Sequence, residues 1–219
     1  MSDFTPTSRT KVRQKPQRGV YERAVIDSIL DEAFVCQLGF VLDGQPYVMP
    51  TNYVRVGDRL FLHGSTASRM FRALAGGAPL CLSVTLIDGL VLAPSATGHS
   101  INYRSVVVLG KAEAIEDEQE KFAAMRAFVE RVIPGRWESV RPPSAEELQR
   151  TMVLAVPLTE VSAKVRTGPP VDDKKEYARE VWTGVLPLKL TPQEPVADPR
   201  GKAGIRVPEY VRNYGKRDR

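Results

Sequence analysis

The first part of the chain changes from a helical to a strand-like pattern of apolar residues. Between Val20 and Ala33 the apolar positions recur with helical spacing and charged residues fall between them, which predicts a short helix. Beyond Ala33, apolar and β-branched residues gather in short runs separated by Asp43-Gly44 and Gly57-Asp58, which favour tight turns. The predicted strands cover residues 34–42, 47–56 and 59–63. We therefore expect an antiparallel meander after the first helix.

The remainder of the chain mixes short helices with further strands. Residues 65–75 have a helical pattern, with Ser65 or Thr66 as the N-cap and Gly76-Gly77 as the stop. Further helices are predicted over residues 117–132 and from a capping box at Ser144. The further predicted strands cover residues 80–87 and 90–95, joined by an Asp-Gly turn, and then 103–115, 153–156 and 161–166. This pattern predicts a mainly β fold, an antiparallel β-barrel with short helices, rather than a doubly wound parallel sheet.

Charge separates a central domain from two basic ends. The net charge is +5 in 219 residues, and much of the excess lies in an N-terminal arm, residues 1–18, and a C-terminal tail, residues 189–219. Such runs are usually solvated, and neither a basic platform with interleaved aromatics nor a helix-turn-helix pattern accompanies them, so we expect no nucleic-acid partner. We expect a flexible arm, an extended or disordered tail, and one domain over residues 19–188.

The sequence also limits the compartment and the metal chemistry. No run of about 18 apolar residues occurs, and no apolar core follows the basic N-terminus, so we expect neither a membrane-spanning helix nor a secretory signal. Cys36 and Cys81 lie in apolar runs, which is typical of buried free thiols, and no cysteine or histidine spacing suggests a metal site. These features predict a cytoplasmic protein without a metal centre.

The segment Leu60 to Arg69, LFLHGSTASR, is the first candidate for binding chemistry. A strand ends near His63 and Gly64, and a helix carrying Ser68 and Arg69 follows. Glycine admits close approach to the backbone, a helix N-terminus favours anions, and arginine can hold two phosphate oxygens. This stretch therefore predicts either a phosphate site or an ordinary capped helix with a surface arginine.

A second polar cluster opens an apolar strand in HSINYRSVVVLG, where Asn102, Tyr103, Arg104 and Ser105 are consecutive. An arginine at the start of a buried strand usually has an anionic partner, because an unpaired buried charge is costly. A phosphate and a structural salt bridge would serve equally well.

Proline in a strand interrupts the hydrogen-bond ladder, so the segment MPTN, with Pro50, Thr51 and Asn52, is expected at a sheet edge or bulge. Its backbone and polar side chains could meet the edge of a planar ring, or the segment could simply be an irregular edge strand. The two histidines, His63 and His99, have no Ser/Asp pattern that completes a hydrolytic triad.

Taken together, these segments resemble the pyridoxamine 5′-phosphate oxidase-like superfamily of FMN-binding split β-barrels. The resemblance is closer to the branch that contains nitroimidazole-resistance proteins, and it covers roughly Val20 to Pro187. The segments that carry it are MPTN, LFLHGSTASR, Asp88 to Val91, NYRSVVVLGKAE and, near the C-terminus, WTGVLP.

The resemblance implies FMN as cofactor and a role for each matching position. Pro50, Thr51 and Asn52 would line the flavin ring edge, and His63 and Gly64 would lie beside the ring or ribityl chain, with His63 as a possible catalytic residue. The phosphate would be held by residues from two segments, namely Ser68, Arg69, Arg104 and Ser105, beside Asn102 and Tyr103. Trp182 would cover the ring from a second subunit or serve as a core or interface anchor.

The implied function is an FMN-dependent oxidoreductase, a homodimer with the cofactor at its interface, that passes electrons to a small acceptor. Met70 stands where oxidases of pyridoxamine phosphate tend to have a basic residue, and their C-terminal substrate-binding pattern is missing, so vitamin B6 oxidation is not expected. A non-catalytic flavin or haem carrier, a nitroimidazole reductase and a deazaflavin protein are the alternatives.

Overall fold

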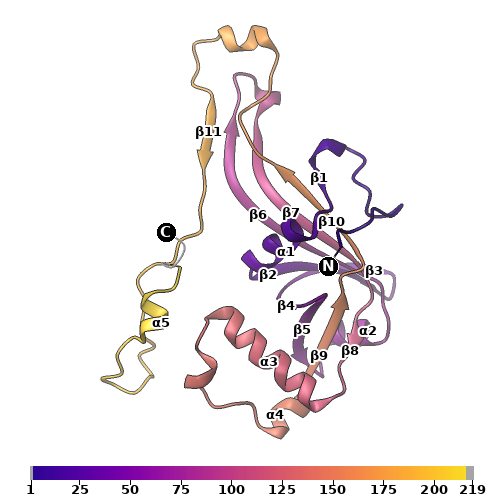
Figure 1. The fold of residues 1–219 in the computed structure, drawn as a ribbon, viewed down its shortest axis with the longest axis vertical. Helices are drawn as coiled ribbons and strands as arrows, with labels where there is room; N and C mark the ends of the chain where they lie inside the picture. The colour runs from indigo at the N-terminus through magenta and orange to yellow at the C-terminus, as the bar shows by residue number, and fades with distance from the viewer. Residues whose placement is uncertain (1, 216–219) are drawn as a thin grey trace.

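Two antiparallel sheets form the body of the protein in the computed structural model, which describes residues 2–215 (Figure 1). In the larger, seven-stranded sheet the order is β1-β10-β7-β6-β2-β3, and β11 pairs with β6 outside this path. Its strands are β1 (Gly19–Val20), β2 (Val35–Leu42), β3 (Gln45–Asn52), β6 (Leu80–Leu92), β7 (Ser100–Gly110), β10 (Glu160–Arg166) and β11 (Gly184–Pro187). The four-stranded sheet has the order β4-β5-β9-β8. Its strands are β4 (Val54–Val56), β5 (Arg59–Ser65), β8 (Glu113–Ala114) and β9 (Thr151–Pro157). The predicted mainly β, antiparallel fold with helices is confirmed.

Short helices cover the sheets and connect the strands. The α-helices are α1 (Arg23–Glu32), α2 (Arg69–Ala75), α3 (Glu118–Val132), α4 (Ala145–Arg150) and α5 (Glu209–Arg212). Single 3₁₀ turns occur at η1 (Pro16–Arg18), η2 (Ala96–Gly98), η3 (Trp137–Ser139) and η4 (Lys174–Ala178). Helix α4 begins with the capping box predicted at Ser144, whose hydroxyl accepts from the N–H of Glu147 while the Glu147 carboxylate accepts from the N–H of Ser144.

The hydrophobic core has two parts. The larger part lies between the sheets, where α1 buries Ile26, Ile29 and Leu30 at helical spacing. The smaller part lies under α3, which buries Ala124 and Phe128 against the four-stranded sheet. Both sheets therefore have a packed face.

The prediction of two strands joined by a turn at Asp88-Gly89 is wrong, because β6 runs through both residues. The pairing with β7 shifts in register between Ile87 and Gly89, which marks a β-bulge. Arg104, across on β7, binds the Asp88 carboxylate at 2.7 and 2.9 Å. A β carbon at Gly89 would lie 3.0 Å from the carbonyl oxygen of Leu186, so β11 also packs closely at this point. Both contacts favour a bulge over a turn.

Two other predicted strands are divided between the sheets. Residues 47–56 become β3 and β4 on either side of Tyr53, whose buried hydroxyl donates to the carbonyl oxygen of Leu30 at 2.6 Å. Residues 103–115 become β7 and β8. These breaks let one continuous apolar segment contribute to both sheets.

The strand β11 lies where the sequence predicted irregular chain, and the α2 N-cap is Ser68 instead of Ser65 or Thr66. Residues 2–18, predicted to be a flexible arm, lie against the barrel: Phe4 joins the core and the Thr7 hydroxyl donates to Glu160 at 2.8 Å. Met1 and residues 216–219 of the predicted tail lie outside the described residues.

The far ends of β6 and β7 form a ribbon that projects from the barrel, and β11 pairs with its outer part (Figure 1). Every residue from Leu186, which is still in β11, to Arg206 is exposed; we call residues 186–206 the outer segment. Its end returns to the body, where the Tyr210 hydroxyl accepts from the Arg136 guanidinium at 3.0 Å.

Candidate functional site

His63 lies near the end of β5, on the face of the small sheet that α3 covers. Its ring packs edge-on against Phe128, with 4.3 Å between the ring centroids. Its Nδ1 is buried and has no hydrogen-bond partner in the structure. Burial lowers the pKa of His63, so the imidazole is neutral at pH 7.

Gly64 is required for packing in this structure. A β carbon at Gly64 would lie 2.5 Å from the Phe71 ring, which α2 places directly over the glycine. The close approach that the sequence suggested for a ligand is therefore made by Phe71 of the same chain.

The turn between β5 and α2 uses most of its own N–H groups. The Thr66 N–H donates to the Arg150 carbonyl, the Ala67 N–H to the Ser65 hydroxyl, and the Ser68 N–H to the Ser65 carbonyl. Ser68 caps the helix by accepting from the Phe71 N–H. The exposed side chain of Arg69 makes no ion pair within residues 2–215, so this turn offers an anion chiefly that guanidinium.

Arg104 is neutralised within its own chain. Its guanidinium donates to Asp88 at 2.7 and 2.9 Å and to both carboxylate oxygens of Glu32, at 2.9 Å for one of them. The hydrogen bonds from Arg104 hold the pKa of Glu32 below its ordinary value and raise that of Arg104. Of the two interpretations left open by the sequence, the structure shows the structural salt bridge.

The neighbours of Arg104 also have partners within the chain. Asn102 is buried, donates to the Gly168 carbonyl at 3.1 Å and accepts from the Arg166 guanidinium. The Ser105 hydroxyl donates to the Lys164 carbonyl at 3.2 Å. Tyr103 pairs with Arg166 across β7 and β10. These side chains hold the strands together, so a cofactor role for them would require rearrangement.

The segment with Pro50, Thr51 and Asn52 lies on β3, at the end of the seven-stranded sheet, as the sequence predicts for a proline-containing strand. Trp182 lies in a different region, just before β11 beside the projecting ribbon. It is 67% exposed, and its ring covers Gly184. In Figure 1, β3 and β11 are on opposite sides of the molecule.

The candidate residues therefore fall into separate groups within one chain. The structure brings His63, Gly64, Ser68 and Arg69 together around the β5–α2 turn, and Asn102 to Ser105 together on β7. The structure does not bring Trp182 close to β3. A flavin site that uses both Trp182 and the β3 residues would therefore need a second copy of the chain.

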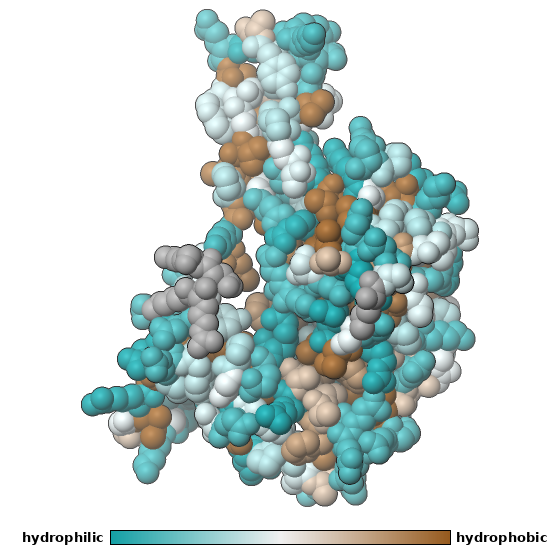
Figure 2. All heavy atoms as spheres, viewed as in Figure 1, coloured by the Kyte–Doolittle hydropathy of each residue, from teal (hydrophilic) through white to brown (hydrophobic). Residues whose placement is uncertain are grey.

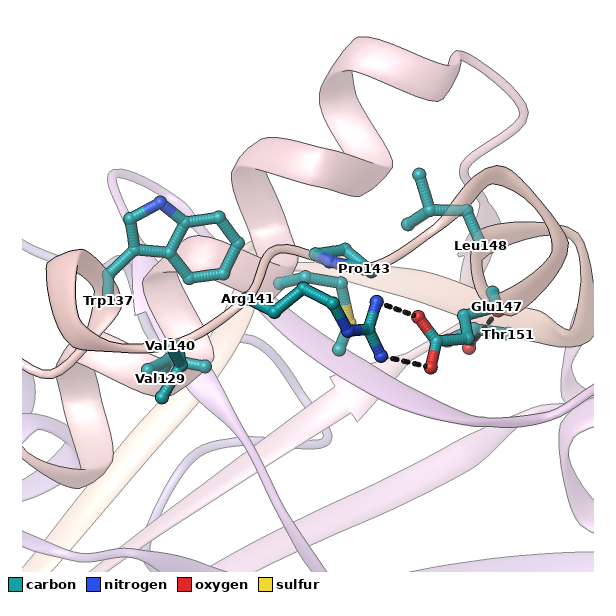
Figure 3. A pocket seen from close by; sticks show the side chains of 9 residues that line it. Val129, Trp137, Val140, Arg141, Pro143, Glu147, Leu148 and Thr151 are labelled. Carbon is teal, nitrogen blue, oxygen red and sulfur yellow. Dashed lines mark hydrogen bonds and ion pairs between the residues drawn. The ribbon is translucent and has the colours of Figure 1, made fainter.

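A shallow groove of about 350 Å³ lies between α3, the following loop and α4 (Figure 3). Its lining is mostly apolar, and the Arg141–Glu147 ion pair crosses one side at 2.8 and 2.9 Å. The lining residues are Met125, Val129, Trp137, Val140, Arg141, Pro143, Glu147, Leu148 and Thr151. None of the residues predicted from the sequence lines it.

Two features of the structure were not predicted as functional. The His99 Nδ1 lies 2.9 Å from the carbonyl oxygen of Ser95; a carbonyl only accepts, so Nδ1 is the donor in this hydrogen bond. Arg166 is almost completely buried without a carboxylate partner. The sequence signal that could have indicated Arg166 was the spacing of Lys164 and Arg166, two residues apart on one predicted strand.

Within residues 2–215 no cluster of three or more metal-ligating side chains occurs, and no helix combines the length and hydrophobicity needed to cross a bilayer.

Comparison with solved structures identifies relatives that share nearly the whole chain. A flavocytochrome, Anf3 from Azotobacter vinelandii, is 41% identical, with a TM-score of 0.90 over 96% of this chain and 98% of that one. An FAD and heme binding protein from Mycobacterium smegmatis is 36% identical, with a TM-score of 0.86 over 90% and 96%. A protein from Bacteroides thetaiotaomicron, described as a 5-nitroimidazole antibiotic resistance candidate, is 26% identical, with a TM-score of 0.57 over 67% and 86%.

Among curated proteins, none matches the sequence. The family model described as pyridoxamine 5′-phosphate oxidase matches residues 22–165. This range includes the four-stranded sheet, the larger sheet except β1, β11 and the last residue of β10, and every candidate residue except Trp182. That range and the two relatives above 30% identity agree with the split-barrel fold seen here. The chain belongs to the pyridoxamine 5′-phosphate oxidase family of split-barrel proteins.

Proposed function

We propose that this chain is a flavin-dependent oxidoreductase that also binds haem and works as a homodimer. The observation that carries the proposal is the similarity, over at least nine-tenths of both chains, to a flavocytochrome and to an FAD and heme binding protein. This similarity extends beyond the barrel, so it includes the projecting ribbon as well as the family's common core.

The exposed candidate residues fit a flavin. Arg69 offers an exposed guanidinium for a phosphate, and β3 offers Thr51 and Asn52 at an open sheet edge. The motifs predict FMN, whereas the Mycobacterium smegmatis relative is described as binding FAD; both contain the same ring and a phosphate. When bound, the flavin would supply transfer of an electron pair or hydride to a small acceptor. The chain would bind and orient it, with the neutral His63 near the phosphate-binding turn.

The separation of β3 from Trp182 supports a homodimer. In one copy these candidate flavin contacts lie on opposite sides of the molecule (Figure 1), so a second copy could bring the Trp182 of one chain to the β3 of the other. The outer segment supports the same arrangement. Within it, Leu190, Val196 and Ile205 are 87%, 96% and 73% exposed, although apolar side chains gain stability when they are buried.

The two histidines differ in their fitness to hold a haem iron. A haem ligand is commonly an imidazole whose other nitrogen donates to a carbonyl or carboxylate. His99 has this arrangement, with Nδ1 bonded to the Ser95 carbonyl and an exposed ring. The unpaired nitrogen of His63 is enclosed by protein, next to Phe128. We therefore assign the haem contact to His99 and keep His63 at the flavin.

The absorbance spectrum of the purified protein tests this proposal. We expect flavin bands together with a Soret band, and mass spectrometry of the released cofactor distinguishes FMN from FAD. His99→Ala should lose the Soret band and keep the flavin bands, whereas the matched variant His63→Ala should keep the Soret band. Arg69→Ala should weaken flavin binding by about 10- to 100-fold, which corresponds to loss of a charge-assisted phosphate contact of ~1.5–3 kcal/mol.

Steady-state turnover with a nicotinamide donor then separates an oxidoreductase from a carrier. A protein that stays free of flavin after incubation with FMN and FAD would contradict the whole proposal. A flavoprotein whose Soret band survives in His99→Ala would contradict only the haem assignment.

A further inference from the structure

Arg166, the last residue of β10, is a buried cation whose partners are all neutral. The side chain belongs to a residue that is only 6% exposed. Its guanidinium donates to the Asn102 side-chain oxygen and to the carbonyl oxygens of Gly168 and Pro169, at 3.3 and 3.1 Å. Its Nε is enclosed and has no partner. Some of the Arg166 N–H groups therefore have hydrogen-bond partners, but no negative charge compensates the positive charge of the guanidinium.

A buried charge without a counter-charge is costly, and the partly buried arginines Arg23, Arg55 and Arg104 all have carboxylate partners. Arg104, on the neighbouring strand, has two of them. In contrast, no ion pair within residues 2–215 involves Arg166, Arg18 or Lys164. The three cations at this end of β10 therefore have no carboxylate partner, unlike Arg104 on the neighbouring strand.

Two further cations lie beside Arg166. Lys164 is two residues earlier on β10, so its side chain shares a sheet face with that of Arg166. Gly19 pairs with Lys164, which brings Arg18 to the same end of β10. Burial and, next, the charge of Arg18 lower the pKa of Arg166. Arg18 and Lys164 are half-buried, so the group reaches solvent through them.

The facing strand adds one hydroxyl group. Tyr103 pairs with Arg166 across β7 and β10, and directly opposed residues share a face. The Ser105 hydroxyl, opposite Lys164, already donates to the Lys164 carbonyl oxygen. A planar guanidinium can hold two oxygens of one phosphoryl group, and lysine and hydroxyl groups donate to the others.

We propose that Arg18, Lys164 and Arg166, which we call the cationic cluster, bind a phosphate or diphosphate group. This site is separate from the Arg69 turn assigned above to the flavin. The phosphoryl group could belong to a nucleotide cofactor or to free phosphate, and the two sources are distinguished below.

The test is a thermal unfolding series of the purified protein with inorganic phosphate or pyrophosphate, compared with sodium chloride at equal ionic strength. Ligand that binds only the folded state raises the melting temperature with its concentration. We expect a saturable rise with pyrophosphate, of about 5–10 °C at a hundredfold excess over Kd for a domain of this size. Arg18→Gln and Lys164→Gln should each reduce the affinity at least tenfold.

The matched control is Arg13→Gln, which removes the same charge from an exposed position of the same N-terminal segment. It should respond to pyrophosphate as the original protein does. Equal responses to chloride and pyrophosphate, or equal responses of Arg18→Gln and Arg13→Gln, would overturn the proposal. Arg18→Gln is the decisive variant because Arg166→Gln risks misfolding.

Competition identifies the source of the phosphoryl group. If pyrophosphate displaces FAD in the original protein but not in Arg18→Gln, the cluster holds the diphosphate of a dinucleotide. If flavin binding is unaffected while the thermal shift persists, the cluster binds free phosphate. Since the thermal shift is measured without flavin, its absence is distinct from a failure to bind flavin.

Discussion

Arg104 and Arg166 lie on the neighbouring strands β7 and β10 of the large sheet. The charge of Arg104 is compensated by carboxylates, whereas that of Arg166 is not. Arg104 binds Glu32 at the end of α1 and Asp88 in the β6 bulge, so one side chain joins a helix to two strands. Arg166 has only amide and carbonyl oxygens. The ion pairs of Arg104 stabilise the fold, whereas the uncompensated charge of Arg166 could still bind an anionic ligand.

The first prediction concerns Arg104→Ala. Removal of the guanidinium leaves Glu32 and Asp88 without the cation that bridges them, so the free energy of unfolding at pH 7 should fall by about 1–3 kcal/mol. Because the partial exposure of the carboxylates weakens the ion pair, we expect less than for a fully buried one. Urea denaturation measures the change, and Arg126→Ala, which breaks the exposed pair with Glu138, should cost at most ~1 kcal/mol.

The effect should also depend on pH. Arg104 lowers the folded-state pKa of Glu32 below its ordinary 4.5, so the carboxylate stabilises the fold above pH 4.5 and this contribution disappears as the pH falls through the lowered value. The stability difference between the original protein and Arg104→Ala should therefore be largest near pH 7 and shrink below pH 4.5. A difference that is constant with pH would contradict the ionic origin.

At the scale of elements, helix α2 packs on strand β5 through the Phe71 ring, which lies over Gly64. Phe71 covers Gly64 so closely that even one methyl group on the strand would meet the ring. This contact fixes the distance between α2 and β5, and therefore the position of Arg69 at the start of the helix.

The second prediction is a double-variant cycle at this contact. Gly64→Ala should lower the free energy of unfolding by about 1–3 kcal/mol through overpacking. The same substitution made in a Phe71→Leu background should cost less, with a coupling of at least ~0.5 kcal/mol. Gly110→Ala is the matched control, since a β carbon there would meet nothing within 4 Å. Equal costs in both backgrounds would show that Phe71 is not the obstacle.

Elements with local signals could be predicted from the sequence, and those that depend on distant partners could not. The capping box at Ser144 and the helix after Asp117 are encoded by neighbouring residues, and both occur in the structure. Asp88-Gly89 has the local pattern of a turn, but its role depends on Arg104 and Leu186. Likewise, β11 exists because it pairs with β6, which periodicity within WTGVLP does not reveal. For Arg104 the sequence left a phosphate and a salt bridge equally open, because Glu32 and Asp88 are distant in the sequence and their position beside Arg104 depends on the fold.

At the scale of the whole molecule, the projecting ribbon and the outer segment are the parts that one copy leaves uncovered. Figure 2 shows hydrophobic side chains on the surface of the ribbon, and Ile87, Leu90 and Ile101 are among its exposed apolar residues. An isolated ribbon of two or three strands is marginally stable in water. The well-packed barrel and this uncovered extension suit an association of two chains.

The third prediction concerns the triple variant L190S/V196S/I205S. These side chains touch little within one copy, so the melting temperature of an isolated copy should stay the same, while the dimer should dissociate at least tenfold more readily. Sedimentation velocity over a concentration series measures the dimer Kd. Val171→Ser is the control, because Val171 is 82% exposed but lies outside the outer segment. The same Kd in both variants would remove the outer segment from the interface.

The outer segment has one further consequence, for the lifetime of copies that have not yet assembled. Residues 189–206 are all exposed and lie beyond the pairing of β11 with β6, and that stretch contains Lys189, Arg200, Lys202 and Arg206. Exposed chain of this kind is the preferred substrate of proteases, which need an unfolded stretch in their active sites. A partner that covers the stretch would protect it. If the proposed dimer covers the outer segment, unassembled copies would be cleaved while paired copies persist, and the protein would accumulate mainly in its assembled form.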